Sequence, residues 1–158
     1  MNRIVLRPIN DRDLVLVSSW LNKNYILKWY NDPDEWLHEI KERHGVFWWI
    51  KHFIVLDGET PIGFCQYYDC YYAKEDWYSV NKPNDTYSIN YFIGEESYLR
   101  KGYGKAIVDL LTRTIIANEK VRRIIVKPDK DNIASNRVLL SNDYVYDEQS
   151  GYYCRLLR

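Results

Sequence analysis

The chain has 158 residues, of which 46% are hydrophobic and 28% charged, and this length and composition are typical of one folded domain with a substantial core. The net charge is zero and basic residues cluster only around residues 100–105, which disfavours a nucleic-acid partner. No apolar run approaches the roughly 20 residues that cross a bilayer, and the first residues lack the apolar segment of a signal peptide. We therefore expect a cytoplasmic protein with no membrane partner.

The first third of the chain predicts one strand and several helices. Pro8 favours extended geometry just before it, and Gly45 is a typical residue at the end of a helix. The predicted elements are a strand at 4–7, a helix from residue 10 or 11 to about residue 21, a short helix or turn at 25–30, and a helix at 34–44.

The remainder alternates strands with helices. Asp57-Gly58 predicts a hairpin between two strands, and residues 69–85 form a long polar and aromatic segment of the kind that is usually functional or mobile. The predicted elements are strands at 52–56, 61–68 and 87–93, a helix at 106–118, a strand at 124–126, a helix at 132–142, and strands at 144–147 and 152–156. This order predicts a single α/β domain over residues 1–158.

The spacing of the cysteine and histidine residues argues against both a disulfide framework and a structural zinc site. Cys65, Cys70 and Cys154 are an odd set without C-x-x-C spacing, which disfavours a disulfide framework. His38 and His44 are six positions apart, whereas two zinc ligands on one helix face are four apart. The sequence therefore predicts no metal site.

The turn at residues 97–105 joins a predicted strand to a predicted helix. Its two glycines, one residue apart, allow a tight turn and close approach of a ligand to the backbone. The helix that follows presents free N–H groups and the positive end of its dipole, which suit a phosphate. Three cations add positive charge, namely Arg100, Lys101 and Lys105. The turn therefore predicts a pyrophosphate site, although the third glycine of a dinucleotide-binding Gly-x-Gly-x-x-Gly is missing.

Several motifs follow one another in a characteristic order. They are Pro61-Ile62-Gly63-Phe64-Cys65-Gln66, the long loop with Trp77, Phe92-Ile93-Gly94, Leu99-Arg100-Lys101-Gly102-Tyr103-Gly104, and Asn132-Ile133-Ala134-Ser135-Asn136-Arg137. Over about residues 53–144 the chain thereby resembles the acetyl-CoA-dependent N-acetyltransferases of the GNAT superfamily, in particular the aminoglycoside 6'-N-acetyltransferases. The resemblance implies a three-layer α+β fold with a mixed, mostly antiparallel sheet flanked by helices.

The resemblance also implies a reaction and a cosubstrate. An amine attacks the thioester of acetyl-CoA directly, through a tetrahedral intermediate and without a metal. In such enzymes the strand before the turn splays from its neighbour and leaves backbone groups for the pantetheine arm, while the turn binds the pyrophosphate. An asparagine at the start of the later helix helps to hold the arm and can also cap the helix. The implied cofactor-binding residues are Tyr91, Phe92, Ile93, Leu99, Arg100, Lys101, Gly102, Tyr103, Gly104, Lys105, Asn132 and Ser135.

Two positions depart from the pattern of this family. Its usual general acid is a tyrosine seven residues after the motif asparagine, but here that position is Leu139, which cannot donate a proton. The aminoglycoside enzymes carry an acidic residue in the strand before the turn, and here it is Asn90, which cannot act as a base. The catalytic residues are therefore not assigned, and a non-catalytic CoA-binding module is an alternative to an enzyme.

The acceptor side is predicted from aromatic and acidic residues. Acidic residues dominate residues 57–99 and basic residues follow them, which indicates one cationic and one anionic ligand, or two solvated faces. The predicted acceptor-binding residues are Trp20, Trp29, Tyr30, Gln66, Tyr68, Asp69, Trp77 and Asn90, with core packing as the alternative for the first two. Such groups suit a small-molecule amine. An aminoglycoside is the nearest acceptor by resemblance, with a polyamine, a siderophore precursor or a protein N-terminus as alternatives, and the protein is expected to be a monomer or a homodimer.

Overall fold

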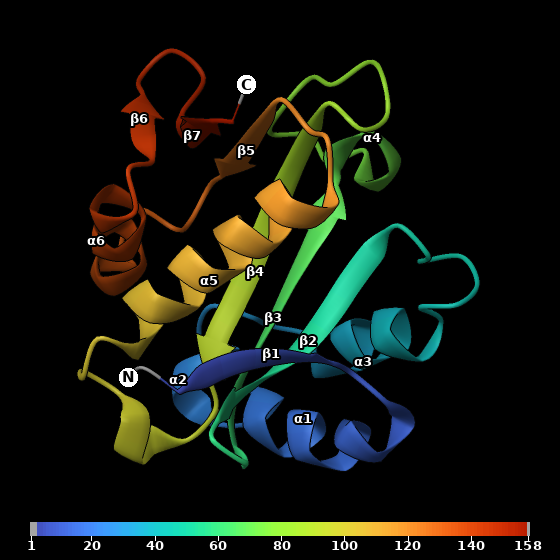
Figure 1. Cartoon of the computed structure of the whole chain (residues 1–158), viewed down its shortest axis with the longest axis vertical. Helices are drawn as coiled ribbons and strands as arrows, with labels where there is room; N and C mark the ends of the chain where they lie inside the picture. The colour runs from blue at the N-terminus through green and yellow to red at the C-terminus, as the bar shows by residue number, and fades with distance from the viewer. Residues whose placement is uncertain (1–2, 158) are drawn as a thin grey trace.

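A mixed sheet organises the structure, a computed structural model that describes residues 3–157 (Figure 1). Its strand order is β1-β2-β3-β4-β5-β7-β6. The strands are β1 (Ile4–Pro8), β2 (Ile50–Asp57), β3 (Thr60–Asp69), β4 (Thr86–Ile93), β5 (Arg123–Val126), β6 (Val145–Asp147) and β7 (Tyr152–Leu156). Neighbouring strands are antiparallel except for β4 and β5, which are parallel.

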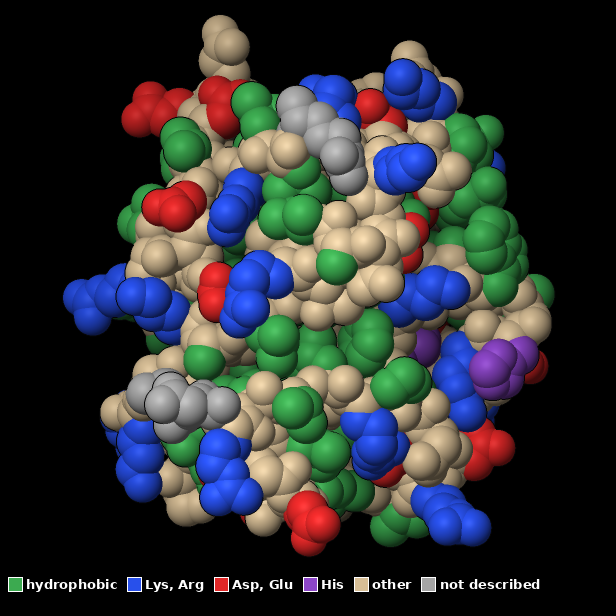
Figure 2. Space-filling model, viewed as in Figure 1, with side chains coloured by type: hydrophobic (Ala, Val, Ile, Leu, Met, Phe, Trp, Pro, Cys, Tyr) green, Lys and Arg blue, Asp and Glu red, His purple; other side chains and the backbone are tan. Residues whose placement is uncertain are grey.

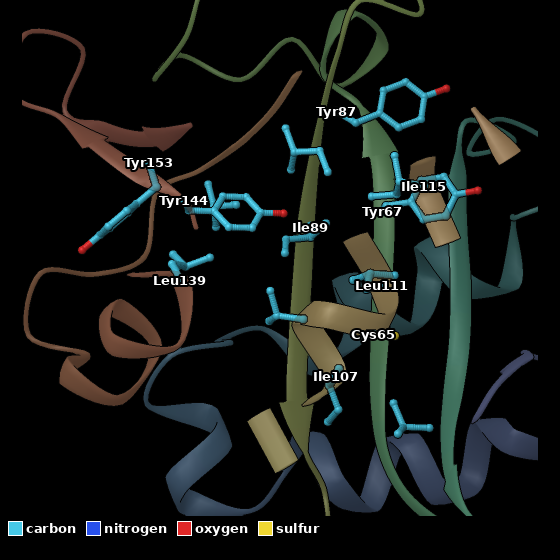
Figure 3. Packing of buried hydrophobic residues seen from close by; sticks show 14 of the residues in the cluster. Cys65, Tyr67, Tyr87, Ile89, Ile107, Leu111, Ile115, Leu139, Tyr144 and Tyr153 are labelled. Carbon is cyan, nitrogen blue, oxygen red and sulfur yellow. The ribbon is translucent and has the colours of Figure 1, made fainter. Parts of the chain in front are cut away.

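Helices cover both faces of this sheet. They are η1 (Asp11–Asp13), α1 (Leu14–Leu21), α2 (Asn24–Leu27), α3 (Pro33–Lys41), α4 (Cys70–Ala73), η2 (Glu96–Tyr98), α5 (Tyr103–Asn118) and α6 (Ile133–Ser141). On one face, Ile107, Leu111 and Ile115 of α5 pack into a buried cluster with side chains of β3 and β4 (Figure 3). On the other face, α1, α2 and α3 form a second buried cluster with residues of β2, β3 and β4. The sheet therefore has a buried hydrophobic cluster on each of its faces.

Alternation along β3 shows how the sequence serves the two faces. Cys65 and Tyr67 belong to the cluster under α5, whereas Phe64 belongs to the cluster under α1–α3, as the two-residue period of a strand requires. Gln66 and Tyr68 follow Phe64 on its face, toward the end of the strand, where they line a cavity. The same strand thus supplies core and site.

The parallel pair β4–β5 is the feature that creates a site. These strands pair only at Thr86–Arg123 and Tyr87–Ile124, and β5 then continues beside β7. From residue 88 onward β4 has β3 on one side and no strand on the other. The splayed strand predicted at residues 91–93 is therefore present in the structure.

The α/β class and the mixed, mostly antiparallel sheet are confirmed. Several predicted boundaries differ by a few residues, as at α2, which ends at Leu27 rather than at residue 30. Two further shifts have a clear cause. α5 begins at Tyr103 rather than at residue 106, because Gly102 takes a left-handed φ of 86° and the helix starts directly after it. α3 ends at Lys41 rather than at residue 44, because residues 42–49 turn back through backbone hydrogen bonds to Glu42.

Among the described residues, the face that bears α5 has no large patch of like charge (Figure 2). Lys and Arg side chains there are scattered among acidic and uncharged ones (Figure 2). Over residues 3–157, no helix is long and apolar enough to span a membrane.

Candidate functional site

Three cavities adjoin one another beside β4. The turn cleft, about 470 Å³, lies between the turn at residues 99–105, α2, β4 and the start of α6. The middle cavity, about 300 Å³, shares Tyr30 and Tyr91 with the turn cleft. The acidic pocket, about 490 Å³, shares Tyr68 and Asn90 with the middle cavity. The shared side chains make the three cavities one path from the start of α5 to α3.

The turn before α5 is shaped to bind an anion. Arg100 and Gly102 both have positive φ, of 59° and 86°, so the chain reverses tightly before the helix begins. The first N–H groups of α5 have no helical acceptor, and they lie at the positive end of the dipole of a 16-residue helix. Arg100, Lys101 and Lys105 are exposed around them. Phosphate is the chemistry that this combination fits.

Tyrosine hydroxyls occupy the open edge of β4. The Oη of Tyr30 donates to the carbonyl oxygen of Tyr91 at 2.5 Å and accepts from the N–H of Tyr91 at 3.3 Å. The Oη of Tyr25 donates to the carbonyl oxygen of Ile93 at 2.7 Å. Burial raises the pKa of Tyr25 to about 12, with smaller contributions from Glu96 and Glu95, so this phenol keeps its proton at neutral pH. The edge is a strip of backbone donors and acceptors that an extended amide chain would match.

The start of α6 forms the opposite wall of the turn cleft. Asn132 caps the helix by accepting from the N–H of Ser135 at 3.2 Å. The Oγ of Ser135 lies 3.2 Å from the Oη of Tyr91, which bridges β4 to α6. All predicted cofactor-binding residues except Lys101 line the turn cleft, and Lys101 is exposed beside it. The sequence missed Tyr25, Ile26, Ala134 and Val138, although each lies within a few residues of a predicted one.

The acidic pocket combines carboxylates with aromatic rings. Glu35 and Glu39 come from α3 and Glu75 from the segment after α4, and no lysine or arginine is among its lining residues. Its aromatic walls are Trp36, Phe47, Trp49 and Tyr68. The sequence interpretation missed most of these residues. A signal was present, because glutamates four positions apart lie on one helix face, where like charges are destabilising and therefore suggest a function.

The electrostatics of the acidic pocket favour a cation. Burial raises the pKa of Glu39 to about 7, and the negative charges of Glu35 and Glu75 add to the shift. One oxygen of Glu75 accepts from the Oη of Tyr68 at 2.5 Å, which holds that carboxylate at the border of the middle cavity. A positively charged ligand would relieve the repulsion among the three carboxylates.

A buried chain of amides leads to Asn90. The Nδ1 of His52 lies 2.9 Å from the Oε1 of Gln66, and the Nε2 of Gln66 donates to the Oδ1 of Asn90 at 2.9 Å. Burial lowers the pKa of His52 to about 4, so the imidazole is neutral at pH 7. The chain fixes Asn90 at the junction of the middle cavity and the acidic pocket.

The structure corrects two predicted acceptor-binding residues. Trp20 is fully buried in the core under α1–α3, and its Nε1 donates to Glu95 at 2.6 Å, so it lines none of the three cavities. Asp69 is also buried, and its carboxylate accepts from the N–H groups of Tyr71 and Asn84. Both residues therefore hold the fold together, because burial and hydrogen bonding already use their polar atoms.

The other predicted acceptor-binding residues lie along the path of cavities. Gln66, Tyr68 and Asn90 line the acidic pocket. Trp29 and Tyr30 line both the turn cleft and the middle cavity, so they border the predicted cofactor as well. Trp77 lines the middle cavity, where its ring lies 5.7 Å from that of Tyr152.

Leu139, at the usual position of the general acid, is fully buried in the core beneath α5. A hydrocarbon at this depth offers no proton and no contact with the cavities. Among residues 3–157, no group of three or more His, Cys, Asp or Glu side chains is placed to hold a metal ion.

A parallel pair of strands that splays beside a helix start suited to a phosphate forms a site for a long, phosphate-bearing ligand. Residues 10–150 match the model of the acetyltransferase (GNAT) domain, and the chain belongs to this family. It is therefore an acyltransferase.

Known relatives are distant in sequence. The aminoglycoside N(6')-acetyltransferase type 1 of Klebsiella pneumoniae is 24% identical over 144 residues, which cover 85% of this chain and 70% of the relative. The crystal structure of aminoglycoside acetyltransferase AAC(6')-Ib with coenzyme A and kanamycin has a TM-score of 0.82 at 20% identity, covering 97% of this chain and 94% of the other. The ribosomal alpha-N-protein acetyltransferase RimL with coenzyme A has a TM-score of 0.75 at 15% identity, covering 99% and 95%. At these identities the structural likeness establishes the fold.

Proposed function

We propose that this acetyltransferase transfers the acetyl group of acetyl-CoA to a primary amine of a small, multiply cationic molecule, with an aminoglycoside as the nearest substrate class. The observation that carries the proposal is the acidic pocket. Three carboxylates and several aromatic walls face one hollow of about 490 Å³ that opens, past Asn90, toward the turn cleft. Carboxylates attract ammonium groups, and aromatic faces add cation–π contacts.

The turn cleft supports the acetyl-CoA half of the proposal. The start of α5 suits the pyrophosphate, and Arg100, Lys101 and Lys105 supply countercharge. The edge of β4 at Tyr91 and Ile93 has no partner strand, and its N–H and carbonyl groups can bind the pantetheine amides once these displace the hydroxyls of Tyr30 and Tyr25. On the other wall, Asn132 and Ser135 border the same arm. Bound in this way, the thioester lies near Tyr91, at the border of the middle cavity.

The reaction needs a neutral amine close to the thioester carbon. The nitrogen attacks that carbon directly, the carbon–sulfur bond breaks, and the amine loses a proton. Asn90 cannot take this proton, but its amide can hydrogen-bond and so orient the amine. Glu75 borders both the middle cavity and the acidic pocket, and we assign its carboxylate as the acceptor of this proton.

Other acceptors keep the same donor chemistry. A polyamine or the amine of a siderophore precursor also carries the positive charge that the acidic pocket selects. A protein N-terminus is the alternative suggested by the fold shared with RimL. A non-catalytic CoA-binding module is favoured by Leu139, which is buried, and by Asn90, which cannot act as a base. The cytoplasmic location and the monomeric or homodimeric state stay predictions, which fractionation and light scattering test.

An acceptor panel tests the proposal. Acetyl-CoA binding is measured by titration calorimetry, and thiol release is followed with an aminoglycoside, a polyamine, a hydroxylamine and a peptide N-terminus. We expect micromolar acetyl-CoA binding and the highest kcat/KM for the multiply charged small amines. The triple variant Glu35→Gln, Glu39→Gln, Glu75→Gln should raise the KM of those amines at least about tenfold and leave acetyl-CoA affinity unchanged.

Glu148→Gln is the matched control, because Glu148 is exposed on the turn between β6 and β7. Turnover of a peptide alone would replace the small amine by a protein N-terminus. Tight acetyl-CoA binding without turnover of any amine would support the non-catalytic module.

A further inference from the structure

The departing sulfur of acetyl-CoA needs a hydrogen-bond donor, and the buried Leu139 cannot supply one. This question rests on the proposed function, because it takes the turn cleft as the acetyl-CoA site. Four hydroxyls that line the turn cleft have defined partners, namely those of Tyr25, Tyr30, Tyr91 and Ser135. Counting their hydrogens separates them into two kinds.

The hydroxyl hydrogens of Tyr25 and Tyr30 already form hydrogen bonds to the backbone of β4. A phenol has one hydrogen to donate. Tyr25 gives it to the carbonyl oxygen of Ile93, and Tyr30 gives it to the carbonyl oxygen of Tyr91. Both hydroxyls therefore face the backbone of β4 as donors and have nothing left for a sulfur atom.

The hydroxyls of Tyr91 and Ser135 together have one hydrogen that their mutual hydrogen bond does not use. Their oxygens lie 3.2 Å apart and either one can be the donor, so the pair has two hydrogens and one mutual bond. The second hydrogen has no partner within the pair, and both residues line the turn cleft and the middle cavity. This hydrogen is free to reach a ligand that runs between the two cavities.

The place of the pair is the second observation. Ser135 and Leu139 are four residues apart on α6 and therefore lie on the same side of that helix. The ring of Tyr91 lies close enough to the start of α5 that a Cβ on Gly104 would come within 3.6 Å of it. Tyr91 thus reaches from β4, past α5, to the side of α6 where the usual tyrosine of this family begins.

We propose that the hydroxyl of Tyr91, paired with Ser135, donates a hydrogen bond and then its proton to the sulfur that leaves acetyl-CoA. As the nitrogen–carbon bond forms and the carbon–sulfur bond breaks, the electron pair of that bond moves to sulfur, which takes the proton of Tyr91. The phenolate recovers a proton from solvent. The acetylated nitrogen releases its own proton to the carboxylate of Glu75, the acceptor proposed above, and from there to solvent. Ser135 is a positioning residue that holds the phenol in the turn cleft.

The environment of Tyr91 keeps it in the donor form. Burial raises the pKa of the Tyr91 phenol, while the hydrogen bond to Ser135 opposes the shift. The phenol is therefore protonated throughout the neutral range, as a donor must be.

Coenzyme A itself provides a test that needs no acceptor. The thiolate absorbance of bound coenzyme A, referenced to protein with bound desulfo-coenzyme A, gives the pKa of the bound thiol. A donor at the sulfur stabilises the thiolate, so we expect this pKa to lie about one unit below that of the free thiol. Tyr91→Phe should abolish most of the shift, and the exposed Tyr146→Phe should keep it. Equal thiol pKa values in wild type and Tyr91→Phe would overturn the proposal.

Turnover gives the second readout. With the best amine of the panel, Tyr91→Phe should lower kcat about 30-fold or more, with the Kd of acetyl-CoA and the melting temperature nearly unchanged. Ser135→Ala should lower kcat less. A fluorinated tyrosine at position 91, which folds like tyrosine but has a more acidic phenol, should bring the alkaline fall of kcat to lower pH. A larger loss in Ser135→Ala than in Tyr91→Phe, or an unmoved alkaline limb, would overturn the assignment.

The two proposals fail differently. If wild type binds neither acetyl-CoA nor coenzyme A, the proposed function is wrong and this inference falls with it. If wild type binds and turns over while Tyr91→Phe behaves like wild type, only the role of Tyr91 is wrong.

Discussion

The turn cleft and the acidic pocket are built in different ways. The turn cleft is formed largely by backbone groups of consecutive residues, as at Gly102 and along the edge of β4. In the acidic pocket, side chains from α3, the turn at 42–49, β3 and the segment after α4 meet across long stretches of sequence. A backbone site is recognisable from a short motif, whereas a side-chain site exists only after folding. The proposed acetyl-CoA site is therefore much easier to predict from the sequence than the proposed acceptor site.

The largest expected effect separates two tryptophans that the sequence placed together. Trp20 is fully buried, whereas Trp29 is half-buried beside the turn cleft. Trp20→Ala should lower the free energy of unfolding by about 3–5 kcal/mol, and Trp29→Ala by about 1 kcal/mol. Urea unfolding measures both. If both variants lost the same small free energy of unfolding and Trp20→Ala bound the amine poorly, Trp20 would be an acceptor-binding residue after all.

A second prediction tests whether the glycines of the turn serve a ligand. A Cβ on Gly104 would lie 3.4 Å from Val138 and 3.6 Å from Tyr91, which are tolerable contacts. An aspartate there also suits the start of a helix. Gly104→Asp should therefore fold normally but weaken acetyl-CoA binding about 100-fold, because its carboxylate repels the pyrophosphate.

Gly104→Ala controls for size and should weaken acetyl-CoA binding only a few-fold. Calorimetric titration with acetyl-CoA, alongside melting temperatures, distinguishes the two variants. Wild-type affinity in Gly104→Asp would place the pyrophosphate elsewhere.

The fold was predictable because its signals are local. The apolar run of β3, the Asp57-Gly58 turn and the helix pattern after Gly104 each indicate an element within about ten residues. These two shifted helix ends depend on backbone conformation, which the pattern of apolar residues does not show. The early start of α5 depends on the left-handed φ of Gly102, and the early end of α3 on hydrogen bonds within residues 42–49.

The site was predictable only where it is made of backbone. Trp20 and Trp29 have the same residue type and similar neighbours, so sequence alone could not tell core from cavity. Likewise the spacing of Glu35 and Glu39 was a local signal, but the pocket they share with Glu75 depends on how α3 packs against a segment more than thirty residues further along the chain. Tyr91 was identified as a contact for the pantetheine arm, but its hydroxyl partner on α6 depends on how α6 packs.

The acidic pocket can be tested through pH. Burial raises the pKa of Glu39 to about 7 in the folded protein, against an ordinary value of 4.5. Between these values the folded protein holds a proton that the unfolded chain has lost, so the free energy of unfolding falls as pH rises through this range and levels off above it. Glu39→Gln removes this dependence and should be more stable than wild type at pH 7.5 but not at pH 4.

Urea unfolding at the two pH values measures the effect, with Glu148→Gln as the exposed control. A cationic amine at saturating concentration should reduce the difference, because it stabilises the ionised carboxylate. The same pH dependence in Glu39→Gln and wild type would show that Glu39 is solvated and not part of a charged pocket.

The smallest expected effect lies between the turn cleft and the middle cavity, where Tyr30 occupies the edge of β4. Its hydroxyl bonds the N–H and the carbonyl oxygen of Tyr91, which the pantetheine arm would otherwise use. Tyr30→Phe should cost the free protein about 1 kcal/mol of stability and tighten acetyl-CoA binding about fivefold, because the arm no longer competes with the phenol. Weaker binding would mean instead that Tyr30 contacts acetyl-CoA directly. The hydroxyl of Tyr30 would then be part of the acetyl-CoA site, rather than a group that the pantetheine arm displaces from the backbone of β4.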